Sequence, residues 1–319
     1  MSIEDNLFPA MDKLTETLKR LESENEDVVK SGRTHLQDAV PIRFSQEISG
    51  WRNMLEKTKK VLEASLPGLK ELALGGTAVG TGLNAPKNFG PEVAKVISEL
   101  TGKEFVTAEN KFHALTAKDD ITFAHGALKA LAADLMKIAN DVRWLASGPR
   151  CGLGEISIPE NEPGSSIMPG KVNPVIPEVV NQVAFNAIGN DMTITMAAEA
   201  GQLELNAFEP IIFYCLFQSI DTIAYAVNTF VDNCVIGITA NETRCRYFVE
   251  NSVGIITAIC PYVGYQKAAE IAKEAIKTGE SVRKLIIEKG LLTKEQMDEI
   301  MDPVQMTEPG ISGKTVNKI

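Results

Sequence analysis

Apolar residues recur along most of the chain at the spacing of amphipathic helices. Near the N-terminus they fall three or four positions apart, with charged residues between them: Phe8, Met11, Leu14, Leu18 and Leu21. This spacing places them on one face of a helix. Longer patterns of the same kind predict further helices over residues 44–73 (with a break at Pro67 and Gly68), 91–101, 114–147, 174–198 and 208–236.

The last two of these segments, 174–198 and 208–236, are apolar on more than one face. A helix that is hydrophobic nearly all round is buried among other helices. Several such helices, each well above the mean helix length, predict a bundle whose faces are covered by other subunits. Strand signals are nearly absent, so the predicted fold class is all-α.

From about residue 241 the predicted helices become shorter. Gly279 follows one helical pattern and is a good C-terminal cap residue. Ser281 begins the next helix, and Thr293 with Gln296 has the spacing of a capping box. The chain therefore divides, by prediction, into a central helical bundle over 1–243 and a small helical domain over 244–319.

Composition narrows the classes of partner. The 319 residues carry a net charge of −10, which argues against nucleic acid or an anionic membrane as the main partner. The five cysteines form no CxxC pair, and no residues have metal-ligand spacing, so we expect no disulfide framework, metal or cofactor. We see no signal peptide and no run of 18 purely apolar residues, so we predict a cytoplasmic protein without a membrane span.

The segment NEPGSSIMPGKVNPVIPE, residues 161–178, combines a loop composition with an unusual charge. Asn173 and Pro174 predict the start of a helix, with Asn173 as its cap. Lys171 lies just before the positive end of that helix, where a cation is unfavourable. An anion bound between Lys171 and the helix would resolve this, so the segment predicts a carboxylate or phosphate site.

A second polar segment, KSGRTHLQDAVP, covers residues 30–41 and contains His35, one of three histidines. Thr34 and Gln37 flank it, which is typical of either a site-lining loop or a capped turn. The glycine-rich segment 75–90 lacks the order of a phosphate-binding loop, and a tight connection between helices is the simpler interpretation.

Three segments resemble the signature regions of one enzyme family. GSSIMPGKVN at 164–173 fits the complete G-S-x-x-M-x-x-K-x-N signature of the fumarase/aspartase superfamily. GRTHLQDA at 32–39 and GGTAVGTGLN at 75–84 resemble its other signature regions in the right order. The resemblance runs from about Asn6 to Lys314. It implies a homotetramer with active sites shared between subunits, and elimination of ammonia or water from a small C4 dicarboxylate through an aci-carboxylate.

The resemblance also implies roles for single residues of the first signature. Ser165 corresponds to the general base, an activated hydroxyl on a closing loop. Ser166 corresponds to the residue whose backbone N–H helps to hold the carboxylate. Lys171 and Asn173 correspond to carboxylate ligands, which would stabilise the developing oxyanion.

Three further residues correspond to the family's remaining site positions. Thr34 and His35 resemble the pair that lines the site from a different subunit. Glu178 matches the acidic partner of that histidine, which would hold the imidazole in one tautomer.

Which lyase the chain encodes depends on segments that conflict. Residues 137–166 and 75–84 resemble class II fumarases, whereas 173–212 and 306–314 resemble aspartases. We favour aspartate ammonia-lyase, converting L-aspartate to fumarate and ammonia, over the alternative of class II fumarate hydratase. The N-terminal domain of the family is absent from this sequence, so a second alternative is a truncated, non-catalytic assembly subunit.

Overall fold

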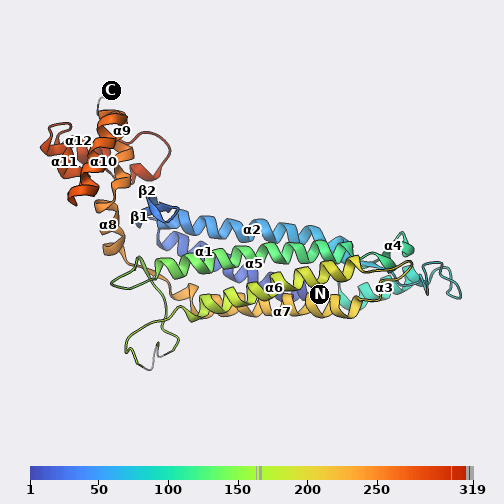
Figure 1. Ribbon diagram of the computed structural model, residues 1–319. Helices are drawn as coiled ribbons and strands as arrows, with labels where there is room; N and C mark the ends of the chain where they lie inside the picture. The colour runs from blue at the N-terminus through green and yellow to red at the C-terminus, as the bar shows by residue number, and fades with distance from the viewer. Residues whose placement is uncertain (163, 165–166, 303, 314–315, 317–319) are drawn as a thin grey trace. The chain divides into compact units, whose positions relative to one another are not determined.

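The computed structural model describes residues 1–162, 164, 167–302, 304–313 and 316. These residues belong to two compact units. Unit 1 comprises 1–18, 51–144 and 159–237, and unit 2 comprises 19–50, 145–158 and 238–319. Both units are built mainly from helices, which confirms the predicted all-α class (Figure 1).

Long helices form unit 1. They are α1 (Phe8–Glu24), α2 (Phe44–Leu69), α5 (Asp119–Leu145), α6 (Val175–Glu199) and α7 (Glu209–Asn233). Helices α1, α2 and α5 each have one end in unit 2. Helices α6 and α7 pack along each other (Figure 1). The buried core contains Leu7, Met11, Leu14, Leu18, Trp51, Leu55, Leu62, Leu128, Leu131 and Phe230. The predicted bundle of long helices is therefore confirmed.

Polar contacts join α2 to its neighbours. The Trp51 indole N–H donates to Asp141 of α5 at 2.8 Å, and the Thr58 hydroxyl donates to Asp134 of α5 at 2.5 Å. A buried indole requires such an acceptor, because its N–H loses water on folding. These bonds fix the register of α2 against α5, because hydrogen bonds require a specific alignment and apolar contacts do not.

Shorter elements complete unit 1. Strands β3 (Glu71–Leu72) and β4 (Val106–Thr107) pair in parallel, and helices α3 (Phe89–Thr101) and α4 (Lys111–Thr116) flank β4 in sequence. The predicted single helix over 114–147 is two helices, α4 and α5. Ala117 between them has an extended backbone, and Asp119 and Asp120 begin α5, where the helix dipole favours negative charge.

Two other boundaries differ from the prediction. Pro67 does not break α2, which continues to Leu69, because a proline in the last turn removes only one hydrogen bond of the helix. Asn173 does not cap α6. The N-cap position belongs to Pro174, without a side-chain cap, and the helix begins at Val175.

Unit 2 contains a hairpin and a cluster of short helices. Strands β1 (Val29–Thr34) and β2 (Gln37–Arg43) pair in antiparallel fashion, as do β5 (Ile156–Ser157) and β6 (Thr239–Ala240). The helices are α8 (Glu242–Asn251), α9 (Ile256–Val263), α10 (Tyr265–Thr278), α11 (Val282–Glu288) and α12 (Lys294–Ile300). Short 3₁₀ turns occur at Val235–Gly237 in unit 1 and at Val253–Ile255 and Gln305–Thr307 in unit 2, and a π-helical turn at Ile3–Leu7 in unit 1.

The predicted caps of the C-terminal helices are confirmed. Gly279 ends α10 in the left-handed conformation, with φ of 75°. The Ser281 side chain caps α11, and Thr293 and Gln296 form a complete capping box on α12. These helices share a core of their own, which includes Ile259, Ile271, Leu285, Ile286, Met297 and Ile300. The domain boundary after residue 243 stays a prediction.

The hairpin over residues 29–43 was missed by the sequence pattern. Its two-residue loop is His35–Leu36, and both residues have positive φ, 54° and 60°. Loops of this kind normally carry Asn-Gly or Asp-Gly, which adopt positive φ without steric cost. Because neither residue is a typical turn former and the strands are largely polar, the segment gave no hairpin signal.

One described helix could cross a membrane by length and composition alone. The segment Glu209–Gly237, which contains α7, has a mean hydropathy of 1.4 over its most apolar window, and half of that window is buried inside the fold. Core helices of bundles have the same character, and α7 packs along α6.

A buried chain of hydrogen bonds connects three helices of unit 1. His125 of α5 is fully buried, and its Nδ1 lies 3.0 Å from Oδ1 of Asp191 on α6. Its Nε2 lies 2.9 Å from the Ser219 hydroxyl on α7, which also accepts a bond from Asn190. Lys129 donates to the other oxygen of Asp191. The Ser219–His125–Asp191 order is that of a hydrolase triad, but Ser219 is fully buried and inaccessible to substrate.

This network predicts a specific dependence of stability on pH. Burial lowers the pKa of His125, an effect larger than the opposing influence of Asp191. The unfolded chain, with a histidine pKa of about 6.5, therefore binds the proton more readily. The free energy of unfolding should fall as the pH drops below about 6.5.

A His125→Asn variant tests this dependence by urea unfolding at several pH values. The variant should be less stable at pH 7.5 by roughly 1–3 kcal/mol, because Asp191 and Ser219 lose a buried partner. Its stability should also decline less than that of the wild type between about pH 7 and 5. Parallel declines in the two proteins would contradict the assignment.

Candidate functional site

We call residues 164–173, which carry the family signature, the signature loop, and the structure describes all of it except its two serines. Ser165 and Ser166, the predicted base and carboxylate-binding residue, lie outside the described residues. Lys171 is exposed, and Asn173 is half-buried. The Asn173 side-chain amide donates to the Gly164 carbonyl, so this asparagine connects the start of α6 to the residue directly before Ser165. Asn173 thus supports the loop instead of capping the helix.

Glu178 lies in the first turn of α6, where a carboxylate is favoured by the helix dipole. Its Oε1 is 3.3 Å from Nη2 of Arg143 on α5. Arg143 Nη1 also donates to Asn140 Oδ1, which accepts a second bond, at 2.9 Å, from Asn181. These four side chains form a polar cluster between α5 and α6.

Two atoms of that cluster have no hydrogen-bond partner among the described residues. They are a donor, Arg143 Nε, and an acceptor, Asn181 Oδ1, and both are buried. A buried polar atom without a partner is costly, so the cluster has the capacity to bind a further polar group beside Glu178.

Sequence reasoning missed Arg143, Asn140 and Asn181. The available signal was their spacing: Asn140 and Arg143 are three residues apart on one predicted helix, and Glu178 and Asn181 are three apart on another. Such pairs lie on one face of a helix. Recognising them as facing pairs would have required knowing that α5 and α6 are neighbours.

Thr34 and His35 lie at the tip of the hairpin in unit 2. Thr34 ends β1, His35 and Leu36 form the turn, and all three residues are exposed. The hairpin therefore presents the imidazole at the surface of its unit. The predicted pairing of His35 with Glu178, which is in unit 1, stays a prediction.

The described residues give no indication of a metal centre. Among them, no group of three or more His, Cys, Asp or Glu side chains is placed to hold a metal ion. The Cys234 and Cys245 thiols are buried, and burial raises the pKa of each to about 12, which makes them poor nucleophiles.

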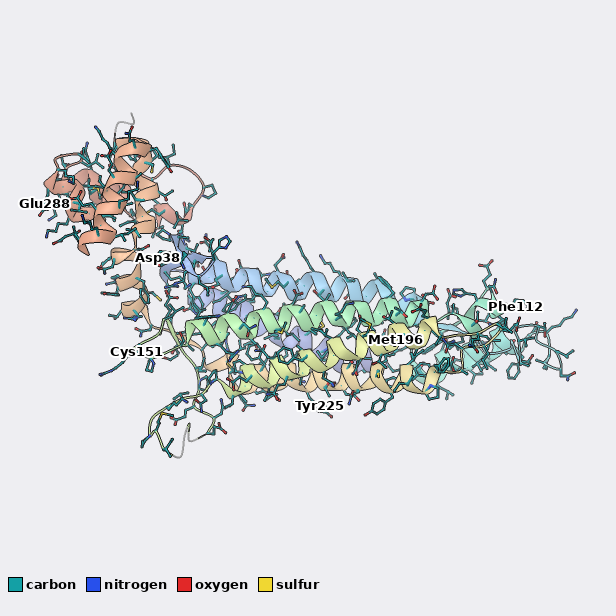
Figure 2. The ribbon with its side chains drawn as sticks, viewed as in Figure 1. Asp38, Phe112, Cys151, Met196, Tyr225 and Glu288 are labelled. Atoms are coloured by element: carbon teal, nitrogen blue, oxygen red, sulfur yellow. The ribbon has the colours of Figure 1, made fainter. Side chains whose placement is uncertain are left out.

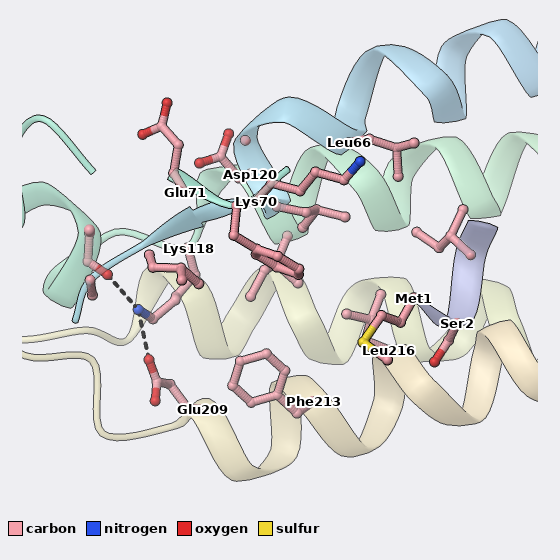
Figure 3. A pocket seen from close by; sticks show the side chains of 18 of the residues that line it. Met1, Ser2, Leu66, Lys70, Glu71, Lys118, Asp120, Glu209, Phe213 and Leu216 are labelled. Carbon is pink, nitrogen blue, oxygen red and sulfur yellow. Dashed lines mark hydrogen bonds and ion pairs between the residues drawn. The ribbon is translucent and has the colours of Figure 1, made fainter. Parts of the chain in front are cut away.

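A pocket of about 400 Å³ in unit 1 is separate from the predicted site residues. Figure 3 shows Leu66, Lys70, Phe213 and Leu216 among the side chains that line it. Lys118 also lines it and lies 2.8 Å from Glu209 Oε1, which compensates its charge (Figure 3). The pocket contains none of the candidate residues, so its size alone does not make it the active site.

Two family models match the chain. The model described as Lyase covers residues 1–189, and the one described as Fumarase C C-terminus covers 255–308. Curated relatives include the class II fumarate hydratases of Bacillus cereus, 54% identical, and Bacillus subtilis, 51% identical. Each alignment covers 97% of this chain and 67% of the relative, so the chain spans about two thirds of their length.

Two solved structures of lyases are also similar to this chain. The class II fumarase of Schistosoma mansoni is 38% identical with a TM-score of 0.94, over 97% of this chain and 68% of that one. A fumarate lyase:delta crystallin of Brucella melitensis bound to cobalt is 44% identical with a TM-score of 0.92, over 96% and 66% of the two chains.

These relatives support the hydratase alternative and not the ammonia-lyase preferred from sequence. The preference rested largely on residues 173–212. This segment comprises α6, the connection over 200–208 and the first turn of α7. Similarity to aspartases over this one segment carries less weight than the identity to class II fumarate hydratases over 97% of the chain.

The strained hairpin tip leads to a prediction about stability. A residue with a Cβ in the left-handed conformation costs about 1–2 kcal/mol, and glycine avoids that cost. Leu36 is 60% exposed, so its replacement removes little buried surface. Leu36→Gly should therefore be more stable than Leu36→Ala, which keeps the strain, by about 1 kcal/mol in urea unfolding. An alanine variant as stable as the glycine variant would show that the tip is unstrained.

Proposed function

The chain belongs to the fumarase/aspartase superfamily of lyases, and on that premise we propose that it acts as a class II fumarate hydratase. The reaction is the reversible elimination of water from L-malate to give fumarate, through an aci-carboxylate. The observation that carries the proposal is the 51–54% identity to class II fumarate hydratases over nearly the whole chain.

In the proposed mechanism, Ser165 removes the proton from the carbon next to one substrate carboxylate. The resulting dianionic aci-carboxylate needs fixed positive charge and N–H donors, and Lys171, Asn173 and the backbone N–H of Ser166 provide them. The hydrogen bond from Asn173 to the Gly164 carbonyl supports this assignment, because it links a proposed substrate-binding residue to the residue directly before Ser165. A serine hydroxyl becomes an effective base only among donors and away from water, which loop closure would achieve.

His35 of another subunit would complete the site, together with Thr34. The exposure of the hairpin tip supports this role, since an imidazole presented at the surface can reach a neighbouring chain. Glu178 would orient that imidazole, and the ion pair with Arg143 keeps its carboxylate in place.

We also propose that the chain assembles as a homotetramer, because α6 and α7 leave apolar side chains exposed at helical spacing. On α6 they are Phe185, Met192 and Met196, and on α7 Tyr214, Phe217 and Tyr225. Figure 2 labels Met196 and Tyr225, which are 62% and 76% exposed. Apolar patches of this kind on long helices mark interaction surfaces. Cytoplasmic localisation stays a prediction.

The assembly is testable by light scattering. The double variant Met192→Glu, Tyr225→Glu should have a lower molar mass than the wild type, since burying two carboxylates in an apolar interface is unfavourable. Leu100→Glu on α3 is the matched control, because Leu100 is 81% exposed outside α6 and α7. An unchanged mass of the double variant would argue against this face as the interface.

Activity is tested with the purified chain and either L-malate or L-aspartate, following fumarate by its ultraviolet absorbance. Fumarate from malate alone is the expected result. Fumarate from aspartate alone would replace the hydratase with the ammonia-lyase. No fumarate from either would favour the non-catalytic assembly subunit.

Substitutions at the signature loop test the proposed roles. Ser165→Ala should lower kcat by about 10²–10⁴-fold without changing thermal unfolding, because it removes the base and not the fold. Ser166→Ala is the matched control and should keep most activity, since that residue acts through its backbone. Lys171→Met should raise KM as well as lower kcat. Comparable activity of the Ser165→Ala and wild-type proteins would remove Ser165 from its role.

A further inference from the structure

The base of the hairpin in unit 2 contains a cluster of four charges, two of which are buried. Glu155, directly before β5, is fully buried, and Lys30 on β1 is 3% exposed. Lys30 Nζ lies 3.3 Å from Glu155 Oε2 and 3.0 Å from Glu47 Oε2 on α2. Arg33 Nη1 lies 2.9 Å from the same oxygen of Glu155. Two cations and two carboxylates therefore compensate one another, with Glu155 and Lys30 buried and Arg33 and Glu47 partly exposed.

The pairing of β1 with β2 is irregular beside this charge cluster. In a regular strand, residues three apart such as Lys30 and Arg33 project to opposite faces. Here the pairing register shifts between Ser31 and Arg33, where Ala39 and Val40 of β2 face the single residue Gly32. Such a bulge increases the local twist and redirects side chains. A side chain at position 32 would collide with the Val40 carbonyl, since its Cβ would lie 2.6 Å from that oxygen.

Helix α8 fixes the same groups from another side. The Phe248 ring contacts two guanidinium groups, with Arg33 at 5.1 Å and Arg244 at 4.4 Å from its centroid. Arg244 also donates to the backbone carbonyls of Gly152 and Leu153, at 2.9 and 3.0 Å. The segment that carries Glu155 is thus held by the helix that also packs on Arg33.

The tip of the hairpin requires such support. His35 and Leu36 both adopt left-handed backbone conformations, and a strained turn persists only where its surroundings determine it. Arg33 is two residues from His35 and is held by Glu155. Breaking a buried charge pair has a large effect because the remaining charge stays buried without compensation.

We propose that Glu155 is a positioning residue for His35: it anchors Arg33 and Lys30, and through them it fixes the conformation of the hairpin tip. Glu155 thus connects strand β1 to the segment directly before β5, within unit 2. The catalytic consequence rests on the proposed function, whereas the structural consequence does not.

Hydrogen exchange of the backbone amides of residues 33–37 tests the structural part in the full chain. Glu155→Gln should raise exchange at these amides by at least about tenfold, because the tip loses its anchor. Glu308→Gln is the matched control. It removes the 2.8 Å pair between Glu308 and Arg43, at the other end of the same hairpin, and should leave exchange at 33–37 unchanged. Unchanged exchange in Glu155→Gln would overturn the proposal.

A double-mutant cycle tests the catalytic part. Glu155→Gln should lower kcat with malate in the wild-type background and have little further effect in a His35→Ala background, because both changes disable one group. Equal fold-losses in the two backgrounds would mean that Glu155 serves stability only, and would overturn its positioning role. If the wild type makes no fumarate from malate, the proposed function fails, and the exchange measurement still decides the structural claim.

Two companion variants keep the test decisive if Glu155→Gln does not fold. The pair Glu155→Gln, Lys30→Met leaves one cation and one carboxylate in the cluster, and Glu155→Asp keeps the charge on a shorter side chain. The paired variant should show the fast exchange at 33–37, and the aspartate variant an intermediate rate. Wild-type exchange rates in both would overturn the proposal.

Discussion

The mutual burial of α6 and α7 is the contact on which the rest of unit 1 depends. Both helices are apolar on more than one face, so neither is stable in water without neighbours. Their packing, together with the buried bonds from His125 to Asp191 and Ser219, sets the register of α5 against both. That register in turn brings Arg143 of α5 to Glu178 in the first turn of α6. The candidate site is therefore a consequence of core packing.

Most helices and the caps of the C-terminal helices were predictable from sequence because they depend on local chemistry, although the prediction of Asn173 as a cap was wrong. Gly279, Ser281 and the pair Thr293 and Gln296 satisfy backbone groups within one turn of themselves, and the structure confirms each. Contacts between side chains of different helices were not predictable from such local patterns. The Arg143–Glu178 pair joins residues that are distant in sequence, and no periodicity indicates which helices are neighbours.

The hairpin failed the sequence criteria for a physical reason. Turn residues such as Asn-Gly indicate a hairpin because they adopt positive φ at little steric cost. His35 and Leu36 have no such preference, so their sequence does not indicate a turn. On the proposed role of Glu155, tertiary contacts through Arg33 maintain the left-handed tip instead. Local preference and global structure disagree here, and such disagreements occur most often at functional sites.

The signature motif identified candidate site residues, whereas the sequence segments used to choose the substrate did not identify the leaving group. Lys171 and Asn173 were identified from a motif whose spacing reflects chemistry at one site, and Asn173 does connect to the serine loop through Gly164. The resemblance to aspartases covers residues 173–212, which comprise α6, the connection over 200–208 and the first turn of α7. Discrimination between water and ammonia as leaving group depends on side chains that contact that group. The ammonia-lyase preference drew largely on similarity within one stretch of the chain, whereas the hydratase proposal rests on 51–54% identity over nearly all of it.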